Sequence, residues 1–224
     1  LGIIEGGTAA VMVRSLFGEA VHGIAVDLVM ALVSSAPAWA NLVSLGFARR
    51  AQGRPKIAFL QPLIVLLTVL VAALALVPAG GGGLAVFLLL YVAARLVWAG
   101  IDTVRSVIWS VNYPRHLRAS ITGRIMINGS IAIALCGLFL GWLLEREGPW
   151  FRVAIAVAGL CGFAGGWAFK RLSVRDEEEL LEAERDRLRE GAKFDLAGIR
   201  HLLATDVAAE GLAVIMVSSE IPEI

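Results

Sequence analysis

The stretch IAFLQPLIVLLTVLVAALALV, residues Ile57 to Val77, decides the fold class because it contains no charged side chain. A helix rises about 1.5 Å per residue, so about 20 apolar residues cross the roughly 30 Å of hydrocarbon in a bilayer. Backbone amides in lipid must pair within their own segment, which favours a helix over other structures. Ile57 to Val77 is therefore predicted to be a transmembrane helix.

The composition of the whole chain supports this interpretation. Of the 224 residues, 58% are hydrophobic and 17% are charged, with a mean hydropathy of +0.78. Soluble domains are about 45 to 50% apolar and about 25% charged. The composition therefore excludes an ordinary soluble domain and indicates a membrane protein.

Outward from this segment, five further apolar runs approach the length of a bilayer. They are Leu1 to Phe17, Ile24 to Phe47, Leu84 to about Val111, Met126 to Leu144 and Phe151 to Phe169. Short connectors of glycine, proline or charged residues separate the runs, as expected between consecutive spans. The sequence predicts an all-α membrane protein whose residues 1–172 form six transmembrane helices.

The chain changes character after the sixth run. Asp176 to Glu190 holds eight acidic residues and three arginines, and it follows Ser173, a residue type that favours the start of a helix. Residues 173–192 are therefore predicted to be a cytoplasmic linker helix. Residues 193–224 are predicted to be a cytoplasmic tail, in which the short apolar run Leu212 to Val217 is typical of a strand.

Basic residues near the ends of the runs are distributed unequally between the two sides. Ten lie on one side and two on the other. The ten are Arg49, Arg50, Arg54, Lys56, Arg115, Arg118, Arg124, Lys170, Arg171 and Arg175, and the two are Arg146 and Arg152. Since cytoplasmic loops are rich in Lys and Arg, the first side and both termini are predicted to be cytoplasmic, in a cell membrane. This rule alone accounts for the basic loop LGFARRAQGRPK.

Two of the basic loops resemble those of the major facilitator superfamily. In the loop after the second run, Gly46, Gly53 and Arg54, with Lys56 close by, match that family's pattern of spaced glycines followed by basic residues. This sequence departs from the family pattern at two positions. Arg50 stands at the family's acidic position, and Ala51 stands at the basic position that follows it. The charge relay attributed to the family loop is therefore not carried over.

The loop NYPRHLRASITGR, after the fourth run, is similar to a second loop of the same family. The matching residues are Arg118, Gly123 and Arg124. The resemblance covers about residues 1–175 and implies the amino-terminal six-helix half of a twelve-helix secondary transporter, which works by alternating access. It also implies that both loops act as gating contacts.

Ionisable residues inside the predicted spans are the candidates for binding a solute. Arg95, Asp102 and Arg105 share one face of the fourth run, and Glu5 lies in the first. A charge in a bilayer costs about 2.5 kcal/mol or more, so such residues face a cavity or pair with each other. One interpretation is a polar pathway in which Glu5 or Asp102 binds substrate or a coupling proton while an arginine neutralises an anion. The other is structural ion pairs, with Arg105 reaching toward the membrane surface.

Other features are predicted to serve packing or membrane anchoring. The steps Gly137 to Gly141 and Gly162 to Gly166 place glycines four residues apart, a spacing that lets helices approach closely. Trp98 and Trp109 are typical of the aromatic residues found near membrane interfaces. These features are expected to support the fold rather than to bind a ligand.

The expected partners follow from this interpretation. They are the lipid bilayer, a small solute with a coupling proton, and a second six-helix half, supplied by a second copy or by a separate polypeptide. One half alone is expected to be an incomplete transporter. The scattered histidines and cysteines predict no metal site, and the sequence predicts no catalytic residue, no cofactor and no nucleic-acid binding.

The end of the chain suggests an alternative class. EGLAVIMVSSEIPEI (Glu210 to Ile224) resembles a segment of the ATP-binding subunits of sugar ABC importers. The sequence has no G-x-x-x-x-G-K-[ST] phosphate loop, which excludes ATP hydrolysis by that motif. The alternatives to a transporter are therefore a membrane component of such an importer and a membrane scaffold without transport activity. A truncated or fused reading frame would also explain the tail.

Overall fold

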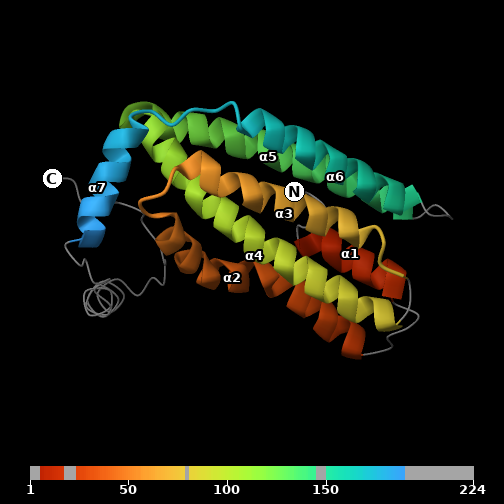
Figure 1. Cartoon of the computed structure of the whole chain (residues 1–224). Coiled ribbons are helices and arrows are strands. Elements are labelled where there is room, and N and C mark those ends of the chain that lie inside the picture. The colour runs from red at the N-terminus through yellow and green to blue at the C-terminus, as the bar shows by residue number, and fades with distance from the viewer. Residues whose placement is uncertain (1–5, 18–23, 79–80, 145–149, 190–224) are drawn as a thin grey trace, which may run out of the picture. The chain divides into compact units, whose positions relative to one another are not determined.

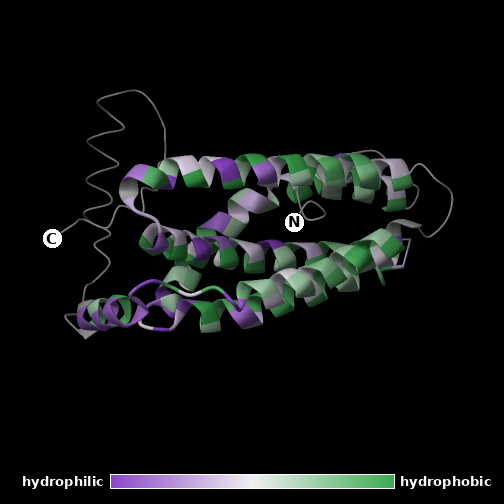
Figure 2. Cartoon of the chain, turned by 90° about the horizontal axis from the view of Figure 1, so that it is seen from above, coloured by the Kyte–Doolittle hydropathy of each residue, from purple (hydrophilic) through white to green (hydrophobic). Residues whose placement is uncertain are grey.

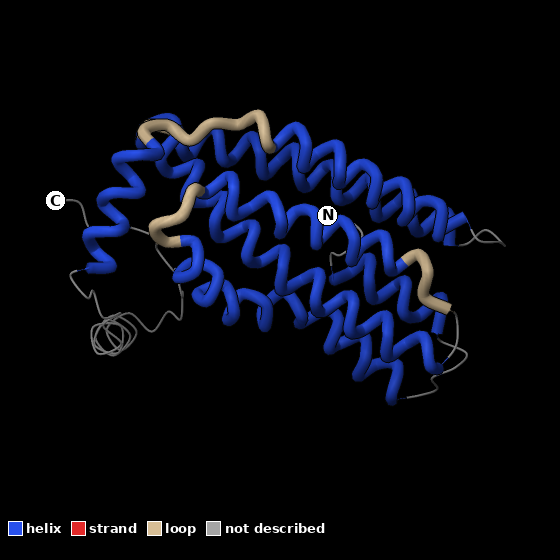
Figure 3. The backbone as a smooth tube through the Cα atoms, viewed as in Figure 1, coloured by secondary structure: helices blue, strands red, loops and turns tan. Residues whose placement is uncertain are grey.

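The computed structural model describes residues 6–17, 24–78, 81–144 and 150–189 of the chain (Figure 1). These residues form seven helices joined by loops. The helices are α1 (Gly6–Phe17), α2 (Ile24–Ala51), α3 (Lys56–Leu74), α4 (Gly81–Asn112), α5 (Arg115–Leu144), α6 (Trp150–Phe169) and α7 (Glu177–Arg189). Figure 3 shows helices and loops but no strand in this part of the chain. The predicted all-α class is confirmed for the described residues.

Five of the helices are long enough and apolar enough to cross a membrane. They are α2, α3, α4, α5 and α6. The first predicted span differs, because its described part is α1, which has only 12 residues. Residues 1–5 of that span, Glu5 among them, lie outside the described residues. The structure thus supports five of the six predicted spans.

The chain divides into two compact units, Leu1–Glu182 and Ala183–Ile224. In the first unit, α4 packs against α2 and α3, and α3 packs in turn against α6. Helix α1 contacts α2 and α5, and α5 contacts α6 (Figure 1). Of the apolar window of α4, 44% is buried, compared with 6% of the corresponding window of α5. Helix α4 is therefore the central helix of this unit, and α5 lies at its edge.

An apolar core joins α1, α2 and α4. Phe17 of α1 lies against Phe87 of α4 with ring centroids 5.7 Å apart, and Phe87 stacks on Tyr91 at 6.2 Å. The hydroxyl of Tyr91 donates a hydrogen bond of 3.1 Å to the carbonyl oxygen of Val33 in α2. A buried phenol requires such a partner, so this bond fixes the position of α2 beside α4.

Glycines of α6 bring this helix close to α3. A Cβ added at Gly162 of α6 would lie 2.9 Å from Oγ1 of Thr68 in α3, and one at Gly166 would lie 2.8 Å from Cγ2 of Ile64. The predicted packing role of Gly162 to Gly166 is therefore confirmed. At Gly141 of α5 an added Cβ would meet nothing within 4 Å, so the packing predicted for Gly137 to Gly141 is not found at Gly141.

The linker after α6 starts its helix later than predicted. Helix α7 begins at Glu177, four residues after Ser173, so the prediction that Ser173 caps this helix is wrong. Asp176 has φ of 48°, a left-handed conformation that the residues of a right-handed helix do not adopt. The helix therefore starts only after Asp176. The predicted tail of residues 193–224 lies outside the described residues.

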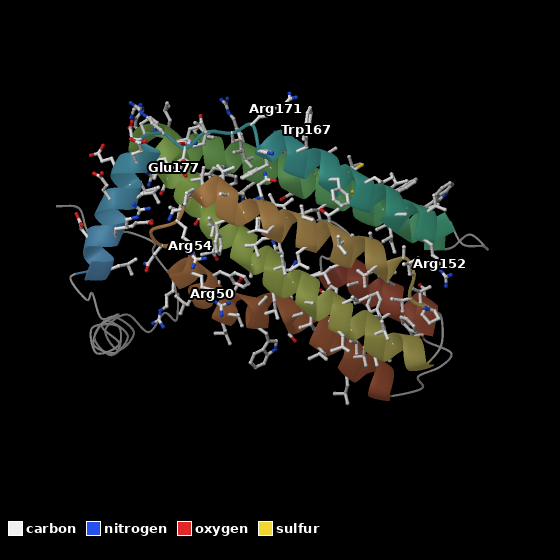
Figure 4. The ribbon with its side chains drawn as sticks, in the orientation of Figure 1. Arg50, Arg54, Arg152, Trp167, Arg171 and Glu177 are labelled. Atoms are coloured by element: carbon white, nitrogen blue, oxygen red, sulfur yellow. The ribbon has the colours of Figure 1, made fainter. Side chains whose placement is uncertain are left out.

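Charged residues gather at one end of the first unit. Figure 2 shows the long helices dominated by hydrophobic residues, whereas the first turns of α7 are hydrophilic. In Figure 4, Arg50, Arg54 and Glu177 lie near this end, and Arg152 lies at the opposite end. We call the end that holds the α2–α3 loop, the α4–α5 loop and the α6–α7 linker the basic end.

Candidate functional site

The candidate site is a stripe of four side chains on one face of α4: Trp98, Asp102, Arg105 and Trp109. Their spacing of four, three and four residues places them along one face of a helix. Asp102 lies ten residues before Asn112, the last residue of α4, which corresponds to about 15 Å along the helix axis. The stripe thus carries ionisable groups well inside an apolar helix of membrane length. We call these four residues the α4 stripe.

Arg105 is the centre of the α4 stripe. Its Nη2 donates to Oδ1 of Asp102, one turn earlier in the same helix. Its Cζ lies 5.2 Å from the ring centroid of Trp98 and 4.5 Å from that of Trp109. Both distances are within the range of cation–π attraction, about 6 Å. The guanidinium is therefore held by one carboxylate and two indole rings.

The members of this ion pair differ in exposure. The side chain of Arg105 is 21% exposed, whereas that of Asp102 is 53% exposed. An ion pair between neighbouring turns with this exposure contributes only about 0.3 to 0.5 kcal/mol to stability. An ion pair between these residues was one of the two interpretations left open by the sequence; the structure contains this pair, and its contribution to the fold is small.

Arg95 belongs to the same face of α4, seven residues before Asp102, but it occupies a different environment. It is 7% exposed and lies near the middle of the helix. The three predicted residues Arg95, Asp102 and Arg105 therefore share a face, and only the last two contact each other through a described ion pair. Glu5, the fourth predicted residue, lies outside the described residues, so its role in binding substrate or a coupling proton stays a prediction.

The α2–α3 loop contains both exposed and buried members of the predicted gating set. Gly53 has φ of 66°, a conformation that glycine adopts without strain, and this turn ends α2. Gly46 and Arg54 are exposed. Lys56 is instead 2% exposed, and its Nζ donates a 2.8 Å hydrogen bond to the carbonyl oxygen of Ala51 at the end of α2. Lys56 therefore connects α2 to the first turn of α3.

The carboxylate of Glu177, the first residue of α7, provides a hydrogen-bond acceptor for the first turn of α3. Oε1 of Glu177 accepts a 3.0 Å hydrogen bond from the backbone N–H of Lys56. The first N–H groups of a helix have no partner within the helix, and a negative charge is favourable there. Glu177 thus binds the linker to the first turn of α3, next to the α2–α3 loop. Sequence reasoning missed this contact because the two residues are 121 positions apart.

Asn112 makes a second connection between the basic segments. Its Nδ2 donates to the carbonyl oxygen of Ser173 at 3.1 Å, and its Oδ1 accepts from the backbone N–H of Arg175 at 2.8 Å. Two hydrogen bonds from one amide join the α4–α5 loop to the α6–α7 linker. We call the contacts of Lys56, Glu177 and Asn112 the basic-end clamp.

The remaining predicted loop residues lie in the first turns of α5. Nη2 of Arg118 donates to the carbonyl oxygen of Ser110 at 2.6 Å, so it satisfies a carbonyl group in the last turn of α4. Gly123 and Arg124 are exposed. The structure thus gives Arg118 a structural contact at the end of α4, and it places Gly123 and Arg124 on the surface of the first unit.

Two further features carry no ligand chemistry. A pocket between α2 and α4 is lined only by apolar residues: Leu32, Ala36, Trp39, Ala40, Val92 and Leu96. Binding sites need a few polar groups to orient a ligand, and this pocket offers none. The described residues include no group of His, Cys, Asp and Glu side chains that would hold a metal ion.

Comparison with known proteins adds no relative from which a role could be transferred. No protein family, curated protein or solved structure matches the chain. What the structure establishes is an all-helical arrangement with five helices long and apolar enough to span a membrane and an ionic, aromatic stripe on the central one.

Proposed function

We propose that the chain is a membrane-embedded six-helix unit of a secondary active transporter of the major facilitator type, which moves a small solute by alternating access. One observation carries the proposal: the side chain of Asp102 is 53% exposed on the central apolar helix. A carboxylate at this depth is costly against lipid, so it favours a water-filled or polar pathway beside α4.

The arrangement of the loops supports the proposal. The two loops that resemble those of the family lie together at the basic end, where Glu177 and Asn112 connect them to the linker. Arg171 lies at the end of α6 with its Cζ 3.8 Å from the Trp167 ring centroid, a pairing suited to a membrane surface (Figure 4). By the distribution of basic residues, we assign this end and both termini to the cytoplasmic side of a cell membrane.

The surface of α5 supports a second half. Asn128 and Ser130 lie near the middle of α5 and are exposed in the first unit. Polar side chains within a span normally face other helices rather than lipid. We therefore propose that a second six-helix unit, from another copy or another polypeptide segment, packs beside this one and completes the pathway.

The proposal is tested without knowing the solute. In a background with Cys136→Ser and Cys161→Ser, Asp102→Cys is placed in sided membrane vesicles and treated with a membrane-impermeant thiol reagent. Alternating access predicts labelling both from the cytoplasmic side and from the opposite side. The matched control is Leu89→Cys, because Leu89 is 73% exposed on the same helix and is expected to face lipid.

The outcomes separate the proposed transporter from a scaffold. Labelling of the Asp102→Cys variant from both sides, with no labelling of the Leu89→Cys variant, supports a transport pathway. Labelling of neither variant in vesicles, when both react in denaturing detergent, means that no water reaches Asp102. That result would leave a membrane scaffold with a structural Asp102–Arg105 pair, and the transport proposal would be abandoned.

A further inference from the structure

The surroundings of Arg105 leave one of its hydrogen-bond donors unused. A guanidinium has five N–H donors, arranged so that a carboxylate can bind two of them at once. In the part of the chain that the structure describes, Nη2 of Arg105 donates to Asp102, while Nε is buried and has no hydrogen-bond partner. A buried donor without an acceptor is unfavourable, so this group favours a second acceptor.

The two indole rings define what kind of acceptor fits beside Arg105. Trp98 lies one turn before Asp102 and Trp109 one turn after Arg105, and both rings are partly exposed. Indole faces bind flat apolar groups by stacking and by dispersion. A ligand that combines a carboxylate with a flat apolar body therefore matches both the guanidinium and the rings.

Asp102 already presents a carboxylate to Arg105. It belongs to the same helix, its side chain is 53% exposed, and it is ion-paired to Arg105 one turn away. A ligand carboxylate that approaches Arg105 must compete with this internal anion for the same guanidinium. Arg105 is thus the group that could bind a ligand carboxylate, and Asp102 is an internal anion that competes with the ligand for it.

We propose that Arg105 binds the carboxylate of an organic anion with a flat apolar body, and that Asp102 is an internal competitor that occupies Arg105 when the ligand is absent. This inference rests on the proposed transport function and names the substrate class of the same site. Trp98 and Trp109 bind the apolar body of the ligand. No covalent step is involved, and binding exchanges one ion pair for another.

Competition predicts opposite effects for the two members of the pair. Asp102→Asn removes the internal anion, so the ligand binds about twofold more tightly, as expected when an exposed ion pair of about 0.5 kcal/mol is lost. Arg105→Gln removes the binding group and abolishes binding. Arg105→Lys keeps the charge but loses the planar fork, so binding falls without being abolished.

The experiment measures equilibrium binding of radiolabelled benzoate to the full chain in lipid nanodiscs. Benzamide is the neutral control of the same shape, and acetate is the carboxylate control without a ring. We expect saturable benzoate binding that acetate competes for weakly and benzamide does not compete for. The matched control variant is Arg175→Gln, because Arg175 is an exposed arginine 3.4 Å from the carboxylate of Asp176. This variant is expected to bind like the original chain.

Three results would overturn the inference: no saturable benzoate binding, equal competition by benzamide, or loss of binding in the Asp102→Asn variant. Size-exclusion profiles and thermal unfolding of each variant separate a lost site from a lost fold. The thiol-labelling experiment at position 102 distinguishes this failure from that of the proposed function. Labelling from both sides without benzoate binding rejects the proposal that the ligand is an organic anion, but it is consistent with the proposed transport function. Absence of labelling rejects the transport function itself.

Discussion

Lys56 in the basic-end clamp and Asp102 in the α4 stripe show two different uses of charge in an apolar chain. Lys56 is 2% exposed and connects two helices through the carbonyl oxygen of Ala51. Asp102 has a 53% exposed side chain, and its ion-pair partner Arg105 lies in the same helix. Burial against another segment makes a charge part of the fold, whereas a local pair that faces outward contributes little to folding and is accessible to a ligand.

The largest effect on stability is expected at Lys56. Lys56→Met fills a similar volume but removes the donor to Ala51, so the free energy of unfolding should fall by about 2 to 4 kcal/mol. The measurement is reversible unfolding in mixed detergent micelles. Arg54→Met is the control, because Arg54 is exposed two residues away in the same loop and should change stability by about 0.5 kcal/mol or less. If both substitutions lowered the free energy of unfolding equally, burial of the charge at Lys56 would not explain its contribution to stability.

A smaller loss is expected at Asn112. Asn112→Ala removes two hydrogen bonds to the linker and should lower the free energy of unfolding by about 1 to 2 kcal/mol. Gln52→Ala is the control, since Gln52 is exposed in the α2–α3 loop. Faster cleavage of the α6–α7 linker by a protease should accompany the loss at Asn112. A linker that stays equally resistant in both variants would show that Asn112 does not hold it.

A smaller effect again is expected at Glu177. Glu177→Gln keeps an acceptor for the N–H of Lys56 but removes the negative charge from the start of α3, which should cost about 0.5 to 1 kcal/mol at low salt. High salt should reduce the difference. Glu178→Gln is the control. It removes a negative charge from the same first turn of α7, so it measures how much stability is lost through the dipole of α7 alone. If both substitutions have the same effect, the contact with α3 has no energetic role.

The smallest effect on stability is expected at Asp102. Asp102→Asn should change the free energy of unfolding by about 0.5 kcal/mol or less, because the ion pair is local and exposed. The same substitution should have the larger effect on benzoate binding. A loss of stability comparable to that of Lys56→Met would place Asp102 among the structural charges.

The sequence predicted the spans well, and local physics explains why. Ile57 to Val77 and the later apolar runs correspond to helices that are long enough and apolar enough to cross a bilayer, and hydropathy alone is sufficient to find them. The helical linker was also predicted, but its start was misplaced. A serine favours the start of a helix wherever it occurs, whereas the left-handed φ of Asp176 depends on the path of the linker and is not encoded by one residue type.

The sequence predicted the candidate site in part. The spacing of three residues placed Asp102 and Arg105 on one helix face and left their pairing as one of two interpretations, and the structure shows that pair. The contacts of Trp98 and Trp109 with Arg105 were missed, although the same helical spacing would have revealed them, because both residues were assigned to the membrane interface. The clamp contact between Lys56 and Glu177 has no local signal, since it joins segments distant in sequence.

The contact between Phe47 and Gly100 has a mechanical consequence. A Cβ added at Gly100 of α4 would lie 2.7 Å from the ring of Phe47, which stands near the end of α2. The aromatic ring therefore packs directly against the backbone of Gly100, where any larger residue would clash with it. Helix α2 cannot slide along α4 unless the ring leaves this contact. Sliding of the two helices past each other is therefore opposed at Gly100, in the turn of α4 that precedes Asp102 and Arg105.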